Sequence, residues 1–274
     1  MKNVLVATDY SDAADNAINY AVELAKFIGA KLVLLHVYSI PIPTGEVPIA
    51  MIPPQELQEL NSKRMKILED RIQKKIGNTI RVESFVRSGL PVDEILGVIK
   101  EKTIDLVIMG IAGAGKLTEI LVGSTTTSLM KKTKTPVLVI PEYAKYQKVE
   151  KIIYACDYEK IEDHSVLKPM CEFAQIFGAE LQIFNVNDSR IHPKTNEAIE
   201  GIALEQWIGN LKHSYWFSDK SNVIDAINGF AKKYEAAMIA MVARKHYFIE
   251  NIIHERETKK MAFHANIPIL SLHD

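Results

Sequence analysis

Residues 4–38, VLVATDYSDAADNAINYAVELAKFIGAKLVLLHVY, contain the pattern that decides the fold. A short apolar run ends at Asp9, a longer segment follows, and a second apolar run begins after Gly29. The segment 13–28 places its apolar residues on one stripe with a period of 3.6, which is typical of an amphipathic helix. Gly29 is expected to end that helix as its C-cap. The stretch therefore predicts a strand, a helix and a second strand.

The same pattern occurs again at residues 152–187, IIYACDYEKIEDHSVLKPMCEFAQIFGAELQIFNVN. Both copies contain an apolar run ending in Asp-Tyr, a helical stretch closing on Phe-x-Gly-Ala, and a second apolar run. The ends of the halves agree as well, because TPVLVIP at 135–141 matches IPILSLH at 267–273. Self-similarity of this kind indicates one fold unit present twice. We predict one domain over 1–144 and a second over 149–274.

Strands and helices alternate along the first half. Continuous apolar runs predict parallel strands that are covered on both faces, at 3–8, 31–37, 79–86, 105–109 and 136–140. The predicted fold class is α/β, with two tandem doubly wound five-stranded parallel-sheet (Rossmann-like) domains related by pseudo-two-fold symmetry. Sheets of this class bind their ligands beyond the carboxyl ends of the strands.

Two further features concern the organisation of the chain. Residues 39–54, SIPIPTGEVPIAMIPP, contain five prolines and predict an ordered excursion or a mobile flap after the second strand. The last strand of each half is apolar, and such a strand at a sheet edge is an aggregation hazard unless it is paired or covered. We expect these two strands to pair in an intrachain pseudodimer. A further homo-oligomer and the identity of any protein partner stay open.

The composition excludes several classes of protein. Of the 274 residues, 47% are hydrophobic and 24% are charged, as in ordinary globular chains. The net charge of −1 provides no electrostatic footprint for nucleic acid or a membrane surface, and we expect neither partner. Asp9 interrupts the first apolar run too early for a signal peptide, and the two cysteines, Cys156 and Cys171, match no redox or zinc spacing. We predict a cytoplasmic protein whose cysteines are core or near-core thiols.

The stretch 104–128, IDLVIMGIAGAGKLTEILVGSTTTS, is the most informative for function. Glycines allow close approach of the backbone to a ligand, and the N-terminus of a helix attracts anions. Two glycine clusters at the end of a strand therefore predict a phosphate cradle, although a turn alone also requires glycine. Gly110-x₄-Gly115-Lys116 satisfies most of a P-loop, but Leu117 stands where the Mg²⁺-binding Ser or Thr belongs.

A second template fits every spacing. Gly110, Gly113, Gly123 and Ser124 form Gly-x₂-Gly-x₉-Gly-Ser, which resembles the nucleotide motif of the universal stress protein family. The resemblance includes Asp9 within ATDYS, the pairs His36-Val37 and Met109-Gly110, and the final strand Pro-Val-Leu-Val. It covers residues 1–141 strongly and 150–274 more faintly.

The resemblance implies ATP as the ligand, with or without Mg²⁺. Adenine and ribose are then expected near Asp9 and Val37, and the phosphates at Gly113 and the start of the following helix. The candidate binding residues are Thr8, Asp9, Val37, Met109, Gly110, Gly113, Gly123, Ser124 and Thr125. Asp9 has an alternative role as a helix N-cap.

The second half lacks this motif. Alignment of the halves sets Met241, Arg244, Glu255 and Arg256 opposite Gly110, Gly113, Gly123 and Ser124. Side chains then occupy the positions where bare backbone faces the anion, and only Asp157, opposite Asp9, is kept. We expect a single nucleotide site per chain, in the first half.

Three functions follow from these patterns. The first is a stress-response protein that binds ATP or a related adenine nucleotide and is non-catalytic or very weakly hydrolytic, since no catalytic residues or metal ligands with convincing spacing are found. The second is a nucleotide-independent interaction module of the same fold. The third, a P-loop ATPase, requires Lys116 as an essential phosphate ligand.

Overall fold

The computed structural model describes residues 1–40, 52–111, 124–158, 161–186, 195–219, 222–243 and 267–273. The first half contains β1 (Asn3–Thr8), α1 (Asp12–Ile28), β2 (Lys31–Tyr38), α2 (Pro54–Ile76), β3 (Val82–Ser88), α3 (Pro91–Glu101), β4 (Leu106–Ile111), α4 (Ser124–Lys132) and β5 (Val137–Pro141). The second half contains β6 (Lys151–Ala155), η1 (His164–Leu167), α5 (Lys168–Phe177), β7 (Glu180–Val186), α6 (Thr195–Ile208), β8 (His213–Ser218), α7 (Val223–Lys233), β9 (Met238–Ala243) and β10 (Ile269–His273). The predicted alternation is confirmed, and the main shift is in β3, which begins at Val82. Of the proline-rich stretch, residues 41–51 lie outside the described residues.

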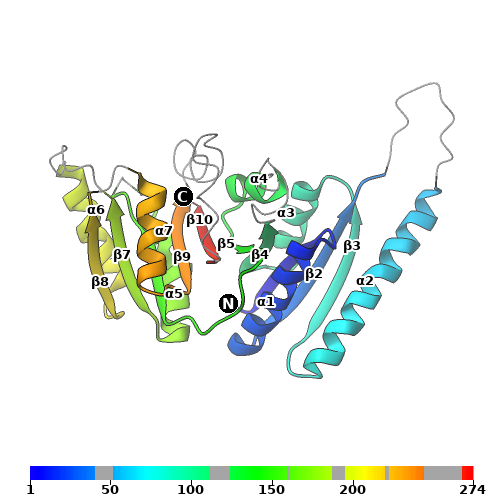
Figure 1. Ribbon diagram of the computed structural model, residues 1–274. Coiled ribbons are helices and arrows are strands. Elements are labelled where there is room, and N and C mark those ends of the chain that lie inside the picture. The colour runs from blue at the N-terminus through cyan, green and yellow to red at the C-terminus, as the bar shows by residue number, and fades with distance from the viewer. Residues whose placement is uncertain are drawn as a thin grey trace.

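The strands form one ten-stranded sheet in the order β3-β2-β1-β4-β5-β10-β9-β6-β7-β8. Each half therefore has the same internal order, and the two halves stand side by side with β5 and β10 at the centre (Figure 1). All pairings within a half are parallel, whereas β5 and β10 pair antiparallel, with Val139 opposite Ile269 and Leu138 opposite Leu270. The fold class and the predicted pairing of the two final strands are confirmed.

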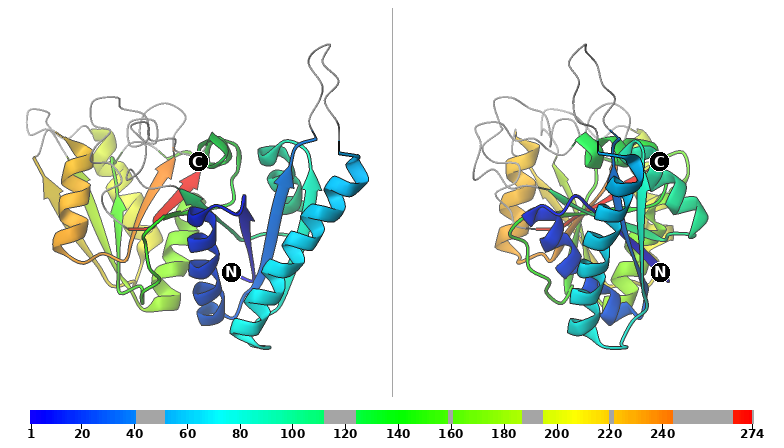
Figure 2. Two further views of the ribbon diagram at one scale, coloured as in Figure 1. Left: turned by 45° about the vertical axis from the view of Figure 1, so that its right-hand side comes forward. Right: turned by 90° about the vertical axis from the view of Figure 1, so that its right-hand side faces the viewer.

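The hydrophobic core is divided by the faces of the sheet rather than by the two halves. One core contains side chains from α1, α2, α5 and α6, and the other contains side chains from α3, α4 and α7. Both cores cross the β5–β10 seam: Leu138 and Leu270 belong to the first, and Val139 and Ile269 belong to the second. On the first face, α1 and α5 lie side by side (Figure 2), and the Phe27 and Phe177 rings stack with centroids 4.6 Å apart.

The segment between the halves is anchored at a few positions, although most of its side chains are exposed. Ala144 and Val149 are buried, and the Tyr146 ring lies edge-on to the ring of Tyr20 at 5.2 Å. The Asn16 side chain on α1 donates hydrogen bonds of 2.9 Å to the carbonyl oxygens of Pro141 and Ala144. The domain boundaries at 144 and 149 remain predictions, because the core is shared between the halves.

The internal repeat extends to unusual backbone conformations. Gly29 and Gly178 both end their helices with positive φ angles, 67° and 61°. Tyr10 and Tyr158, the residues after the matched aspartates, also have positive φ angles of 64° and 53°. Tyrosine rarely adopts this left-handed region because its Cβ crowds the backbone. The same strained turn has therefore been kept after the first strand of each half.

The two halves differ at the start of their first helix. In the first half α1 begins at Asp12, with Ser11 as its N-cap. In the second half the corresponding region forms the short helix η1, and α5 begins only at Lys168, directly before Pro169. Proline favours the first turn of a helix because it has no N–H to donate. The second half therefore lacks the first turns of this helix.

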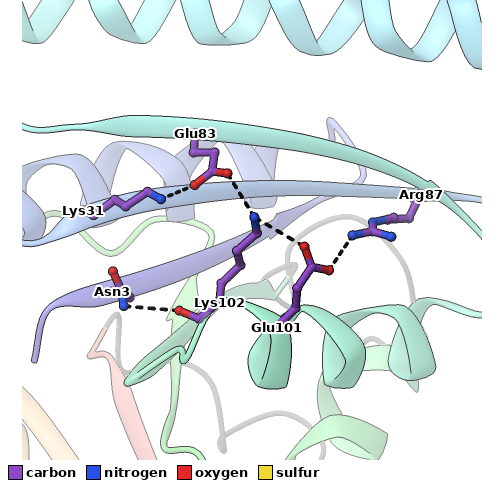
Figure 3. Close-up of polar contacts among 6 residues, drawn as sticks. All are labelled: Asn3, Lys31, Glu83, Arg87, Glu101 and Lys102. Carbon is purple, nitrogen blue, oxygen red and sulfur yellow. Dashed lines mark hydrogen bonds and ion pairs between the residues drawn. The ribbon is translucent and has the colours of Figure 1, made fainter.

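A network of charged side chains fastens α3 to the edge of the sheet (Figure 3). Glu83 on β3 pairs with Lys31 on β2, and its other oxygen lies 3.1 Å from Nζ of Lys102, beside the end of α3. Lys102 also lies 3.3 Å from Glu101, which pairs with Arg87 at 2.6 Å. The hydrogen bond from Lys31, reinforced by Lys102, lowers the pKa of Glu83 below its ordinary value. These pairs hold α3 over the face of the sheet on which part of the candidate site lies.

Because both cores cross the seam, we predict that the two halves unfold together. The two tryptophans, Trp207 and Trp216, both lie in the second half, so their fluorescence reports on that half, whereas far-ultraviolet circular dichroism reports on the whole chain. The two signals should have one denaturation midpoint in guanidinium chloride.

Leu270→Ala should lower the free energy of unfolding by about 2–5 kcal/mol and shift both signals equally. The control Ile67→Ala, at an exposed position on α2, should change it by about 0.5 kcal/mol or less. Separate transitions for the two signals would contradict the shared core.

Candidate functional site

The described candidate residues meet at the carboxyl ends of three neighbouring strands. Thr8 ends β1 and Asp9 follows it, Val37 lies near the end of β2, and Met109 and Gly110 lie near the end of β4. Since β2, β1 and β4 are adjacent in the sheet, these residues share one edge. This is the edge at which doubly wound sheets bind ligands.

The turn between β1 and α1 is held by its own side chains. The Tyr10 N–H donates to Oγ1 of Thr8, and the Ser11 N–H donates to Oδ1 of Asp9, both at 3.0 Å. The Ser11 hydroxyl accepts a hydrogen bond from the Ala14 N–H and caps α1. The N-cap is therefore Ser11, and the alternative role of Asp9 as the cap is wrong. The Asp9 carboxylate is exposed at the edge of the sheet.

Val37 and Met109 lie on the same face of the sheet. Both contact the core formed with α3 and α4, and so does Ala7 on the intervening strand β1. The register places Ala7 beside Leu35 on β2, and continuing the pairing of Val6 with Ile108 places it beside Met109 on β4. The small side chain of Ala7 lies between the larger side chains of Val37 and Met109. Together these three residues form an apolar surface at the carboxyl edge of the sheet, which we call the apolar floor.

Gly110 is required by packing as well as by any ligand. A β-carbon at this position would lie 2.4 Å from the carbonyl oxygen of Ala13 and 2.6 Å from its carbonyl carbon. The first turn of α1 therefore packs directly on β4, and only glycine allows this approach. Gly110 thus sets the height of α1 above the strand.

The phosphate end of the predicted site is described only in part. Gly113 and Gly123 lie outside the described residues, as do Lys116 and Leu117 of the P-loop alternative. Ser124 begins α4, which confirms that a helix starts here, and Thr125 is half-buried in its first turn. The role of the nine candidate residues in binding stays a prediction.

Sequence reasoning missed a polar cluster beneath the β1–α1 turn, on the α2 side of the sheet. The His36 ring is buried, and its nitrogens lie 2.8 Å from the Thr8 carbonyl oxygen and 3.1 Å from Oδ1 of Asn61 on α2. The Tyr10 ring centroid is 4.4 Å from that of His36, and the Arg64 guanidinium lies 4.0 Å from the Tyr10 centroid. Burial raises the pKa of the Tyr10 hydroxyl, and the charge of Arg64 opposes that rise. The available signal was His36, the single polar residue in the apolar run LVLLHV at 32–37. Asn61 and Arg64 lie on a helix that is mostly polar, and the sequence gave no signal for them.

The second half keeps the aspartate of the site but not the glycine motif. Asp157 is exposed like Asp9, but the register corrects the predicted alignment of the next strands. Val6 pairs with Ile108, and its counterpart Tyr154 pairs with Ala240. Met241 is therefore opposite Met109, and the residue opposite Gly110 is Val242, not Met241. Arg244, Glu255 and Arg256 lie outside the described residues.

The cavity beneath the second turn, on the face that carries α5 and α6, is small. It has a volume of about 10 Å³ and is lined by side chains that include Tyr158, Ile161, His164 and Glu200. Nε2 of His164 lies 2.9 Å from the buried carboxylate of Glu200, which joins η1 to α6. This space is about that of a single water molecule.

Metal and membrane sites were also searched in the described part of the chain. There, the His, Cys, Asp and Glu side chains form no group of three or more that could hold a metal ion. None of the helices described combines the length and apolarity that a membrane span requires. Cys156 is buried and Cys171 partly buried, and neither forms a disulfide.

The comparisons with known proteins agree on one family. The model of the universal stress protein family matches residues 1–141. Universal stress protein YxiE of Bacillus subtilis is 32% identical over 143 residues, which cover 50% of this chain and 97% of that protein. A universal stress protein from Archaeoglobus fulgidus covers 99% of this chain and 98% of its own with a TM-score of 0.74 at 19% identity, which shows the same fold over both halves. A universal stress protein solved in complex with cAMP is 25% identical, with a TM-score of 0.37, and covers 51% of this chain and 96% of its own.

The packing of Gly110 against Ala13 leads to a prediction about stability. Gly110→Ala should lower the free energy of unfolding by about 1–3 kcal/mol, because the added methyl group must displace the backbone of α1. The matched control is Gly97→Ala in α3, where a β-carbon meets no atom within 4 Å. That change should stabilise the protein by about 0.5–1 kcal/mol through higher helix propensity. Chemical denaturation of the two variants provides the measurement, and equal stability would contradict the close approach of α1.

Proposed function

Because the chain belongs to the universal stress protein family, we propose that its first half binds ATP or a related adenine nucleotide as part of a stress response. The observation that carries the proposal is the convergence of Asp9, Val37 and Met109 at the edge where β2, β1 and β4 end, next to the stretch with the complete glycine motif. The protein is non-catalytic or only very weakly hydrolytic in this proposal. It acts in the cytoplasm, where cysteines that form no disulfide stay reduced.

Each part of the nucleotide has a partner of suitable chemistry. The apolar floor of Ala7, Val37 and Met109 suits the adenine ring. The exposed carboxylate of Asp9 is an acceptor for ribose hydroxyl groups. The phosphates are assigned to Gly113, Gly123 and the N-terminus of α4, where backbone N–H groups and the helix dipole favour an anion.

A magnesium ion bound with ATP is not required by this arrangement. Neutral backbone donors and a helix N-terminus stabilise phosphate oxygens directly. Mg²⁺ usually binds through one or two carboxylates together with substrate phosphates and water. Among the candidate binding residues, Asp9 is the carboxylate that could bind such an ion. In this proposal Asp9 is already assigned to the ribose.

The second half is assigned a structural role. Val242 places a side chain where Gly110 leaves none, and the other motif glycines have no counterpart in the sequence of this half. We therefore predict one nucleotide per chain. Isothermal titration calorimetry with ATP should give a stoichiometry of about one, whereas two equivalent sites would contradict the assignment. Absence of binding would instead support the nucleotide-independent interaction module.

The phosphate assignment is tested at Gly113. Gly113→Arg and Gly113→Glu should both weaken ATP binding, because a side chain replaces close contacts from backbone N–H groups. Loss of two hydrogen bonds to charged groups, at roughly 1.5–3 kcal/mol each, weakens binding on the order of a thousandfold. The glutamate variant controls for compensation by the guanidinium, which is able to pair with phosphate. If both variants melt like the parent and bind ATP with parental affinity, the glycine loop is only a turn.

Lys116→Ala separates this proposal from the P-loop alternative. The P-loop alternative requires the lysine as a phosphate ligand, whereas the present proposal does not.

A further inference from the structure

We propose that His36 is a positioning residue of the nucleotide site. It holds the turn that carries Asp9, and it does so fully only when both of its ring nitrogens carry a proton. The inference rests on the proposed function, because the position of Asp9 matters for binding only if Asp9 contacts a nucleotide. It adds a residue that lies on the opposite face from Val37 and Met109 and reaches the ligand only through the backbone of β1.

Both ring nitrogens of His36 face hydrogen-bond acceptors. Nδ1 lies 2.8 Å from the carbonyl oxygen of Thr8, which only accepts. Nε2 lies 3.1 Å from Oδ1 of Asn61. The orientation of this amide is fixed by its other end, because Nδ2 of Asn61 donates to the Leu57 carbonyl oxygen at 2.8 Å. A neutral imidazole has one N–H, so only the imidazolium form satisfies both contacts.

The second half provides an internal comparison. Asn185 on β7 occupies the place of His36, since Phe184 pairs with Ala155 just as Leu35 pairs with Ala7. Nδ2 of Asn185 donates to the carbonyl oxygen of Cys156 at 2.9 Å, which is the counterpart of the bond from His36 to Thr8. The bond that fixes the end of the first strand is therefore common to both halves. The bond to Asn61 and the second proton belong to the half that keeps the nucleotide motif.

The groups around His36 accommodate a positive charge. The Tyr10 ring is tilted by 46° against the His36 ring with centroids 4.4 Å apart, and an aromatic neighbour favours a cation. The exposed Asp9 carboxylate, on the same turn as Tyr10, carries the opposite charge. Arg64 on α2, in contact with the Tyr10 ring, opposes it. On β3 the register partner of His36 is the uncharged Val86. His36 is 9% exposed, so a charge on its ring needs stabilisation from these neighbours and from its two hydrogen bonds.

The path from His36 to Asp9 is short. His36 holds the carbonyl group of Thr8, and the hydroxyl of Thr8 holds the N–H of Tyr10, so Asp9 lies between two fixed peptide groups. Loss of one proton leaves a nitrogen lone pair facing Oδ1 of Asn61. The contact between α2 and this turn is then weakened, and Asp9 is less well positioned.

The test uses adenosine, which has no group that titrates in the range of an ordinary histidine, about pH 5–8. Binding to the full chain is followed by NMR. Between about pH 5.5 and 8 the affinity of the parent protein should fall roughly three- to tenfold, as expected for one lost hydrogen bond. His36→Asn copies the second half and should bind with little pH dependence. Asn61→Leu, which removes the acceptor, should also flatten the profile. The control His213→Asn removes a histidine in the second half and should keep the parental profile.

A second readout separates this inference from the proposed function. In the nucleotide-free protein, nitrogen-detected NMR of the imidazole should show two protonated nitrogens for His36 under the conditions in which adenosine binds most tightly, and one where the affinity has fallen. A single protonated nitrogen at low pH, or a flat affinity profile for the parent, overturns the role of His36. Absence of adenosine and ATP binding at every pH contradicts the proposed function instead, and the NMR result still decides the protonation of His36.

Discussion

Val137, Leu138 and Val139 of β5 pair with three residues of β10, and this short antiparallel contact is the constraint on which the rest of the structure depends. It joins two five-stranded parallel units into one sheet and carries both hydrophobic cores across the middle. An apolar strand at the edge of each unit would otherwise expose unpaired backbone groups. The duplication of the fold unit within one chain therefore solves an edge problem that each unit has by itself.

The two halves differ most clearly where the first helix meets the sheet. The first half keeps Gly110, and the first turn of α1 packs directly on β4. The second half has Val242 at that place, and its α-helix begins only at Lys168, after η1. A valine side chain and a helix turn would compete for the same space, so these two changes are consistent with each other. In the second half, the contact between His164 and Glu200 joins η1 to α6.

The candidate site depends on both faces of the sheet. Val37 and Met109 are on the face with α3 and α4, which the charged network around Glu83 and Lys102 fastens to the sheet. His36 is on the face with α1 and α2, and it acts on the backbone of β1 from below. The turn with Asp9 lies between these two supports, at the end of the strand to which both are attached. A residue's part in such a site is therefore not limited to contact with a ligand.

The sequence by itself determined the repeat, the alternation of strands and helices, the parallel sheet and the pairing of the two final strands. These features follow from local periods of apolar residues and from the need to cover an apolar edge, and both can be recognised without knowing what packs on what. It also determined where Thr8, Asp9, Val37, Met109 and Gly110 lie, because strand ends define one edge of a parallel sheet.

Only the tertiary structure decided how that edge is held. It showed that Ser11 rather than Asp9 caps α1, that Val242 rather than Met241 stands opposite Gly110, and that Asn61 of α2 lies against His36. An alignment of two diverged halves slips easily by one residue, whereas hydrogen-bonded register does not. The partners of His36 are 28 and 25 residues away along the chain, and no local pattern encodes such contacts. They exist because the folded sheet brings β1 and β2 together and lays α2 across them.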